Sequence, residues 1–238
     1  MLTGVSHPDS SSGVGGNGKN GPMADRAKHT AADVRRAVDR VRAVLDREGL
    51  LLSHDPEIPS ATSIIAGAPI RGTWWSHPRG SLIYDALGVL EEEVAWPKLV
   101  TGKITLVHRR LWPALFVVGT CRAPWQMNKL KNDAEWLLRQ VLARKSLRSD
   151  KLDLPLGSRK MGAVVTDLEQ RLLVCTRSEH TEGGHHARYV ETWATWQEQA
   201  KLSKAELPLL DQALDLLTAP VRKLTKQPSL KGWLPWMT

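Results

Sequence analysis

The sequence predicts a mainly α fold with a small β-hairpin, arranged as a winged-helix-like element plus a helical bundle. Two observations predict it. Apolar residues recur at helical spacing over several segments, and two short β-prone runs flank Thr101-Gly102. Residues 1–25, rich in Ser and Gly, are expected to form a disordered tail. Residues 26–238 are expected to form a single mostly helical domain with a sub-boundary near 150–160.

The first helix is predicted from its two ends and its apolar stripe. Apolar residues recur at helical spacing between Val34 and Leu45, which indicates one buried face. Thr30 with Asp33 is typical of an N-terminal cap, and Gly49 is typical of the residue that ends a helix. These local signals predict an amphipathic helix between Thr30 and Gly49.

A helix, a hairpin and a second helix are expected next. A helical pattern occupies 82–90, two β-prone runs separated by a two-residue turn occupy 97–107, and a helix is expected at 109–118. A basic hairpin between helices is compatible with a winged-helix arrangement, in which the hairpin touches a nucleic-acid backbone.

The remainder of the chain is predicted to be mainly helical. The expected helices lie at 126–146, at 163–178, at 187–201 and after Ser203–Glu206, a capping-box pattern. The tail Gly232–Trp236 is expected to pack back on the body, because two exposed Trp side chains would lower solubility.

Positive charge is concentrated in one part of the chain. The formal net charge is +8, and between Lys98 and Lys160 fourteen Lys or Arg stand against four Asp or Glu. Such a concentration is typical of proteins that bind a phosphate backbone, because each Lys or Arg that pairs with a phosphate releases a counterion. The alternative is a solvated basic surface without a partner.

Several classes of protein lose support. No apolar run approaches the length needed to cross a bilayer and no signal-peptide core is present, so a cytoplasmic protein is expected. Cys121 and Cys175 have no C-x-x-C spacing, which argues against a disulfide framework or a zinc knuckle. Phosphate-loop, dinucleotide, zinc-protease and serine-hydrolase motifs are absent, so we expect no cofactor, no metal and no nucleotide partner.

The segment around 73–79 is the candidate base pocket. Trp74, Trp75 and His77 lie beside Arg79 on a loop bounded by Pro and Gly. Flat rings next to cationic groups can stack on an unpaired base. The alternative is that one or both indoles belong to the core, since Trp is usually largely buried.

A second group of candidate DNA-binding residues lies on or just after the hairpin. Lys103, His108, Arg109 and Arg110 suit phosphate contacts, and either arginine could enter a groove. Alternatively, one of the arginines extends over the protein surface without a ligand.

The segment Glu179–His186 is the candidate catalytic site. It places two carboxylates and three imidazoles around Gly183-Gly184, so we expect Glu182, and after it Glu179, to act as the carboxylate with His180 assisting. Two alternatives stay open. The histidines could bind a metal, although their spacing matches no closed signature, or the segment could be a polar loop between helices.

Three stretches also carry a resemblance to known proteins. Gly72–Pro78, Lys98–Trp112 and His180–Trp193 together resemble a bacterial family whose make-up is similar to helical, winged-helix-bearing DNA glycosylases, including those that remove modified bases from phage DNA. No catalytic motif of an established glycosylase family is matched residue by residue, so the resemblance assigns no residue a role.

The resemblance implies a monofunctional DNA glycosylase, which flips out a damaged or modified base and hydrolyses its N-glycosidic bond. DNA is the expected partner, no membrane is involved, and a monomer is expected. The alternatives are a non-catalytic winged-helix DNA-binding protein or regulator, and a protein-interaction module whose basic face meets an acidic partner.

Overall fold

The computed structural model describes residues 29–152, 160–180, 186–203 and 207–237, and for 178–180 and 186–187 it describes the backbone alone. The tail expected at 1–25 lies outside the described residues. The helices are α1 (Ala31–Glu48), α2 (Ala61–Ala66), α3 (Gly80–Leu90), α4 (Trp112–Thr120), α5 (Pro124–Met127), α6 (Asn132–Arg144), α7 (Met161–Gln170), α8 (Trp193–Gln199) and α9 (Leu210–Thr225), with short 3-10 helices η1 (Trp74–Ser76), η2 (Arg109–Leu111) and η3 (Ser149–Lys151). The strands are β1 (Leu50–Leu52), β2 (Val94–Ala95), β3 (Lys98–Val100), β4 (Lys103–His108), β5 (Ser146–Arg148), β6 (Cys175–His180) and β7 (His186–Glu191).

Helix α1 forms as its end signals predict. The Asp33 amide donates to Thr30 Oγ1 at 3.2 Å and the Thr30 amide donates to Asp33 Oδ2 at 2.8 Å, which completes a capping box. Gly49 ends the helix at φ 87°, a left-handed conformation that glycine adopts without a steric cost. The apolar stripe, represented by Val38 and Leu45, is buried.

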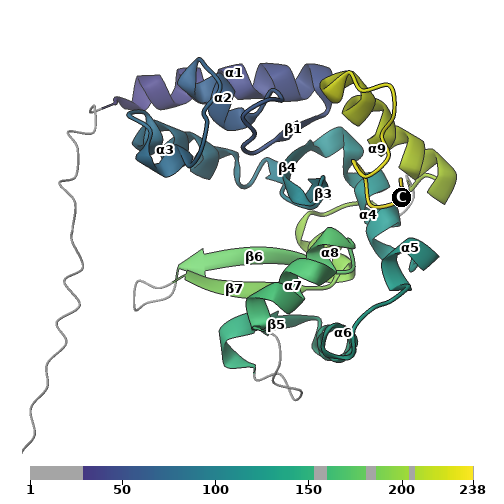
Figure 1. Cartoon of the computed structure of the whole chain (residues 1–238). Helices are drawn as coiled ribbons and strands as arrows, with labels where there is room; N and C mark the ends of the chain where they lie inside the picture. Colours follow the sequence, from purple (N-terminus) through teal and green to yellow (C-terminus); the bar gives the residue numbers. More distant parts are fainter. Residues whose placement is uncertain (1–28, 153–159, 181–185, 204–206, 238) are drawn as a thin grey trace, which may run out of the picture.

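The first sheet has β4 at its centre. Strand β4 pairs antiparallel with β1, β2 and β3, and the β3–β4 hairpin confirms the prediction for 97–107. Because β4 is paired with β1, through Leu50 opposite Val107, the hairpin is part of a sheet beneath α1 and is not a free-standing loop (Figure 1).

The second sheet corrects two of the expected helices. The segment 163–178 contains α7 only as far as Gln170 and then becomes β6, and the segment 187–201 begins as β7 before α8. Strands β5, β7 and β6 form an antiparallel sheet in that order, with Cys175 opposite Glu191. Residues 179, 180 and 186 therefore lie on strands, so the alternative of a loop between helices was wrong about the flanking elements; residues 181–185 lie outside the described part.

Two hydrophobic cores organise the described residues. The first core joins α1–α4 and α9 with β1–β4, and the second core joins α6 and α7 with β5 and β7. Leu147 and Val164, which lie on either side of the expected sub-boundary near 150–160, belong to the same second core. Buried Gln126 links the two halves, because its amide nitrogen donates to Val118 O at 3.2 Å and to Arg171 O at 3.0 Å. The two parts are visible as the upper and lower regions of Figure 1.

The coarse fold class is confirmed, since helices predominate and the strands form small antiparallel sheets. Within the described ranges, no helix is long and apolar enough to traverse a lipid bilayer.

Candidate functional site

The turn at 73–79 presents a stacked aromatic pair on the surface. The Trp74 and Trp75 ring centroids lie 3.9 Å apart with an interplanar angle of 25°, and Tyr84 of α3 lies 5.8 Å from Trp75. Trp75 is 55% exposed, whereas Trp74 is half-buried against the first core. A Cβ at Gly80 would lie 2.9 Å from the carbonyl oxygen of Trp75, so glycine at this position lets the turn close against α3. The structure thus brings the predicted indoles together and leaves one ring available for stacking.

An arginine-lined hollow adjoins the same turn. Arg36 and Arg40 are one turn apart on α1, and with Arg79 they line a hollow of about 320 Å³ that also includes Pro78. One carboxylate, Asp33, faces these three cations. The backbone and side-chain hydrogen bonds from Thr30, and then that from Arg36, lower the pKa of Asp33 to about 2, so Asp33 is ionised; it caps α1 and also pairs with Arg36 at 2.6 Å. The hollow therefore carries an excess of positive charge.

His77 and Arg79 shape this surface from within the turn. The Arg79 amide donates to His77 Nδ1 at 3.1 Å, which orients the imidazole. The Arg79 guanidinium donates to the carbonyl oxygens of Ile65 and Ala66 at the end of α2. Arg79 is nevertheless exposed, so it can also face a ligand in the hollow.

The predicted DNA-binding residues on and after the hairpin have partners within the protein. Lys103 pairs with Asp55 at 2.7 Å, and His108 pairs with Asp46 at 3.0 Å. Arg110 donates to the carbonyl oxygens at the end of α1, and the Arg109 guanidinium lies 5.3 Å from the centroid of the Trp112 ring. Lys103, Arg109 and Arg110 stay exposed, but a phosphate would compete with these partners.

The candidate catalytic residues are only partly described. Glu182 lies outside the described residues. Glu179 and His180 lie on the backbone of β6, opposite Ala187 and His186, and their side chains are also outside the described part. Among the described side chains, no hydrogen bond or ion pair joins the 73–79 turn to β6 or β7.

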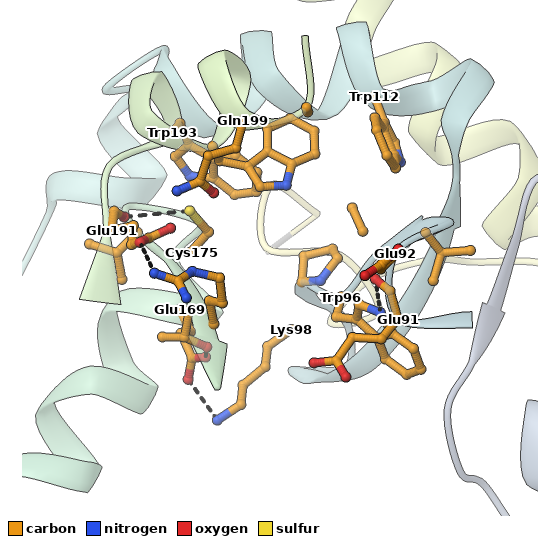
Figure 2. Close-up of a pocket in the computed structure, with 18 of the residues that line it drawn as sticks. Glu91, Glu92, Trp96, Lys98, Trp112, Glu169, Cys175, Glu191, Trp193 and Gln199 are labelled. Carbon is orange, nitrogen blue, oxygen red and sulfur yellow. Dashed lines mark hydrogen bonds and ion pairs between the residues drawn. The ribbon is translucent and has the colours of Figure 1, made fainter. Parts of the chain in front are cut away.

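A large cavity lies between the two cores. It has a volume of about 710 Å³, within the range of small-molecule sites, and it is bordered by residues from α3 through β3 on one side and from α7 through α8 on the other. Figure 2 shows Glu91, Glu92 and Trp96 on one side of this space, facing Glu169, Cys175 and Glu191 on the other. Sequence analysis did not predict this site.

Glu169 is the centre of a buried ionic network beside the cavity. Its side chain is 8% exposed and it accepts from Lys98 Nζ at 2.8 Å, from Thr176 Oγ1 at 2.6 Å and from the Arg188 guanidinium. Burial raises the pKa of this carboxyl group, but the hydrogen bonds from Arg188, Lys98 and Thr176 outweigh burial and lower it overall. Glu169 is therefore ionised at neutral pH and has no proton to donate.

Two further polar groups of the cavity wall, Glu191 and Cys175, are similarly committed. Buried Glu191 accepts from Ser146 Oγ at 3.0 Å and from Arg177 at 3.1 Å. Burial raises the pKa of the Cys175 thiol, and the Glu191 carboxylate adds to this effect, so the thiol stays protonated. This arrangement suits binding of a ligand better than nucleophilic attack on one.

Three indoles lie on one side of the cavity: Trp196 is half-buried, and Trp112 and Trp193 behind it are 6% and 4% exposed. Trp196 meets Trp112 and Trp193 edge to face, with centroid separations of 5.4 and 5.3 Å. The ring nitrogen of Trp112 donates to Val107 O at 3.0 Å and that of Trp193 donates to Leu172 O at 2.7 Å, which fixes both rings. The wall is therefore largely pre-formed.

One sequence signal could have revealed part of this site. Gly183-Gly184 between β-prone runs, with Thr176 on one side and Tyr189-Val190 on the other, is typical of a hairpin. Recognising it would have placed Cys175 and Glu191 opposite each other. No local signal indicates that Glu91 and Trp96 face them across the cavity, because that depends on how the two cores pack.

Comparison with known proteins gives no relative: no protein-family model, no curated protein and no solved structure matches the chain.

Proposed function

We propose that the chain is a DNA-acting protein that holds an unpaired or extruded nucleotide on the turn at 73–79. It would act in the cytoplasm as a monomer and without a cofactor. The observation that carries the proposal is that one turn bears both the exposed, stacked Trp75 and Arg79, which lines a hollow with Arg36 and Arg40 of α1. An aromatic platform beside a cationic groove suits single-stranded nucleic acid, since the ring stacks on a base and the cations neutralise phosphates.

The elements that we propose to contact DNA differ from those of a winged-helix protein. In a winged-helix arrangement, the β3–β4 hairpin would contact the DNA backbone. Lys103 and His108 on β4 already have carboxylate partners. Arg36 is likewise paired with Asp33, but the hollow holds three arginines against this one carboxylate, so we place the principal contacts on α1 and the 73–79 turn, with the hairpin as a secondary contact.

Replacing Trp75 by alanine should weaken binding to a single-stranded oligonucleotide by roughly tenfold or more, because stacking of one base on an aromatic ring contributes about 1–3 kcal/mol. Trp75→Phe should retain most of the affinity. Fluorescence anisotropy with a labelled oligonucleotide measures both. Leu209→Ala is the matched control, since Leu209 is also an exposed apolar side chain, 73% exposed against 55% for Trp75, and lies outside the turn. Equal affinities for the wild type and Trp75→Ala would refute the stacking role.

Base excision is the reaction that we propose for this protein. Water would add to the sugar C1′ as the N-glycosidic bond breaks, and a carboxylate would stabilise the oxocarbenium-like sugar; the base leaves with the bonding electron pair and takes up the proton that the water loses. Two features support the proposal: the resemblance of three stretches to a bacterial family whose make-up is similar to DNA glycosylases, and the position of Glu179 and His180 at the end of β6, close to Glu182 in the sequence. No nucleotide or metal motif is needed for this chemistry.

Incubation with unmodified plasmid and with heavily modified phage DNA should produce abasic sites, counted with an aldehyde-reactive probe. Glu182→Gln and Glu179→Gln should bind DNA like the wild type but produce fewer sites, whereas Glu57→Gln, which changes an exposed carboxylate, should leave the yield unchanged. If neither DNA acquires abasic sites while salt-sensitive binding persists, the protein is a non-catalytic DNA-binding protein.

A further inference from the structure

The cavity between the two cores has aromatic walls that the proposed DNA contacts do not use. The Trp196 ring stands at 63° to Trp112 and at 81° to Trp193, so the three rings form the sides of a corner. Trp96 lies across the cavity from Trp193 (Figure 2). Indole faces carry negative partial charge and attract cations and flat rings. The walls therefore favour an aromatic or cationic ligand over an anion.

The charged residues that line the cavity also favour a cationic ligand over an anion. Four carboxylates, at Glu91, Glu92, Glu169 and Glu191, stand against two cations, Lys98 and Arg177. Both cations are committed to carboxylates of the cavity wall: Lys98 pairs with Glu169 at 2.8 Å and Arg177 with Glu191 at 3.1 Å. An anionic ligand would have to displace these pairs.

The surplus negative charge lies on the opposite side of the cavity. Glu91 and Glu92 are exposed, and neither has an ion-pair partner among the residues that the structure describes. They follow α3 directly, next to Trp96, whose ring nitrogen donates to the Glu91 carbonyl oxygen at 3.3 Å. Glu91 and Glu92 therefore lie beside the Trp96 indole. Across the cavity they face the side that contains Trp112, Trp193 and Trp196.

We propose that this cavity binds a small organic cation with a flat aromatic ring. The ring lies against the half-buried indole of Trp196, which buried Trp112 and Trp193 hold in place, and the positive charge faces Glu91 and Glu92. This site is separate from the proposed DNA-binding surface and does not depend on it, because none of its lining residues belongs to the 73–79 turn or to the arginine hollow.

Three probes of one ring system test the charge preference: the N-methylated nicotinamide cation, neutral nicotinamide and anionic nicotinate. Isothermal titration calorimetry with the full chain should rank them in that order. We expect the cation to bind roughly tenfold more tightly than the anion, since each carboxylate near a bound charge contributes a modest Coulomb term in a water-accessible site. Absence of binding by all three probes, or equal binding of all three, would overturn the proposal.

A charge-neutralising variant locates the site. Glu91→Gln combined with Glu92→Gln should weaken binding of the cation roughly tenfold and leave nicotinamide binding nearly unchanged. Glu57→Gln combined with Asp215→Asn removes the same charge from exposed positions outside the cavity and should change neither affinity. All four side chains are exposed, so the variants should keep the Tm of the wild type. An unchanged preference for the cation in the first variant would contradict the assigned site.

Discussion

Replacement of Glu169 by alanine is expected to lower the free energy of unfolding by about 3 kcal/mol, because it leaves two partly buried cations without their carboxylate. Lys98 and Arg188 both pair with Glu169, and their side chains are 18% and 33% exposed. Urea denaturation at pH 7 measures the loss. Glu198→Ala, which removes an exposed carboxylate of α8, is the control and should change stability by less than about 0.5 kcal/mol.

The same network predicts how stability changes in acid. The folded state lowers the pKa of Glu169 below its ordinary value of 4.5, so the folded state favours the ionised form. The stability that ionised Glu169 contributes is therefore present above pH 4.5 and is lost as the pH falls through the folded pKa. The difference in unfolding free energy between the wild type and Glu169→Gln should be constant from about pH 6 to 8 and shrink in acid. A difference independent of pH would show that the charge of Glu169 is not what stabilises the network.

Replacement of Gly119 by alanine is expected to destabilise the protein by about 2–3 kcal/mol through overpacking. A Cβ at this position of α4 would lie 2.4 Å from Trp193 Cε2 and 2.5 Å from Trp193 Nε1, far closer than atoms can approach. The Trp193 ring cannot turn away without losing its hydrogen bond to the carbonyl oxygen of Leu172. Thermal unfolding followed by circular dichroism measures the change.

A matched glycine gives the opposite expectation. Gly88 lies within α3, and a Cβ there would meet nothing within 4 Å. Gly88→Ala should therefore stabilise the protein by about 0.5–1 kcal/mol, as alanine restricts the unfolded chain. If Gly119→Ala were as stable as the wild type, the packing of Trp193 against α4 described above would be incorrect.

The elements that were predicted well are those with local signals. Helix α1 follows from Thr30, Asp33 and Gly49, because a capping box and a left-handed glycine depend on residues close in sequence. The β3–β4 hairpin follows from its Thr-Gly turn in the same way. The packing of the segment Gly232–Trp236 was also predicted correctly: Trp236 packs on α9, where its ring nitrogen donates to Thr218 Oγ1 at 3.2 Å.

The end of α7 was not predicted, because no residue near it in the sequence signals that the helix ends. Val164 and Leu168 fit a helical period, and the apolar residues that follow allow the pattern to continue. The chain instead leaves the helix at Leu172, which adopts φ 52° although it is not glycine. No turn residue marks this break, and tertiary packing of Leu172 in the first core determines it.

The candidate site was predictable only where it is continuous in sequence. Trp74, Trp75 and Arg79 come together because one turn carries them. Their neighbours Arg36 and Arg40 could not be foreseen, since α1 reaches the turn only through the packing of α1 on α3. The inter-core cavity was beyond sequence analysis for the same reason.

The salt dependence of DNA binding tests the central claim most directly. For a single-stranded oligonucleotide, the slope of log affinity against log salt should fall by roughly 0.7 for each phosphate contact that is removed. Arg36→Gln combined with Arg40→Gln should therefore reduce the slope by about 1.4. Arg139→Gln combined with Arg144→Gln, which changes two exposed arginines of α6 within the basic stretch 98–160, should leave it unchanged. A reduced slope in the α6 variant alone, or no binding by the wild type, would contradict an interface on α1 and the 73–79 turn.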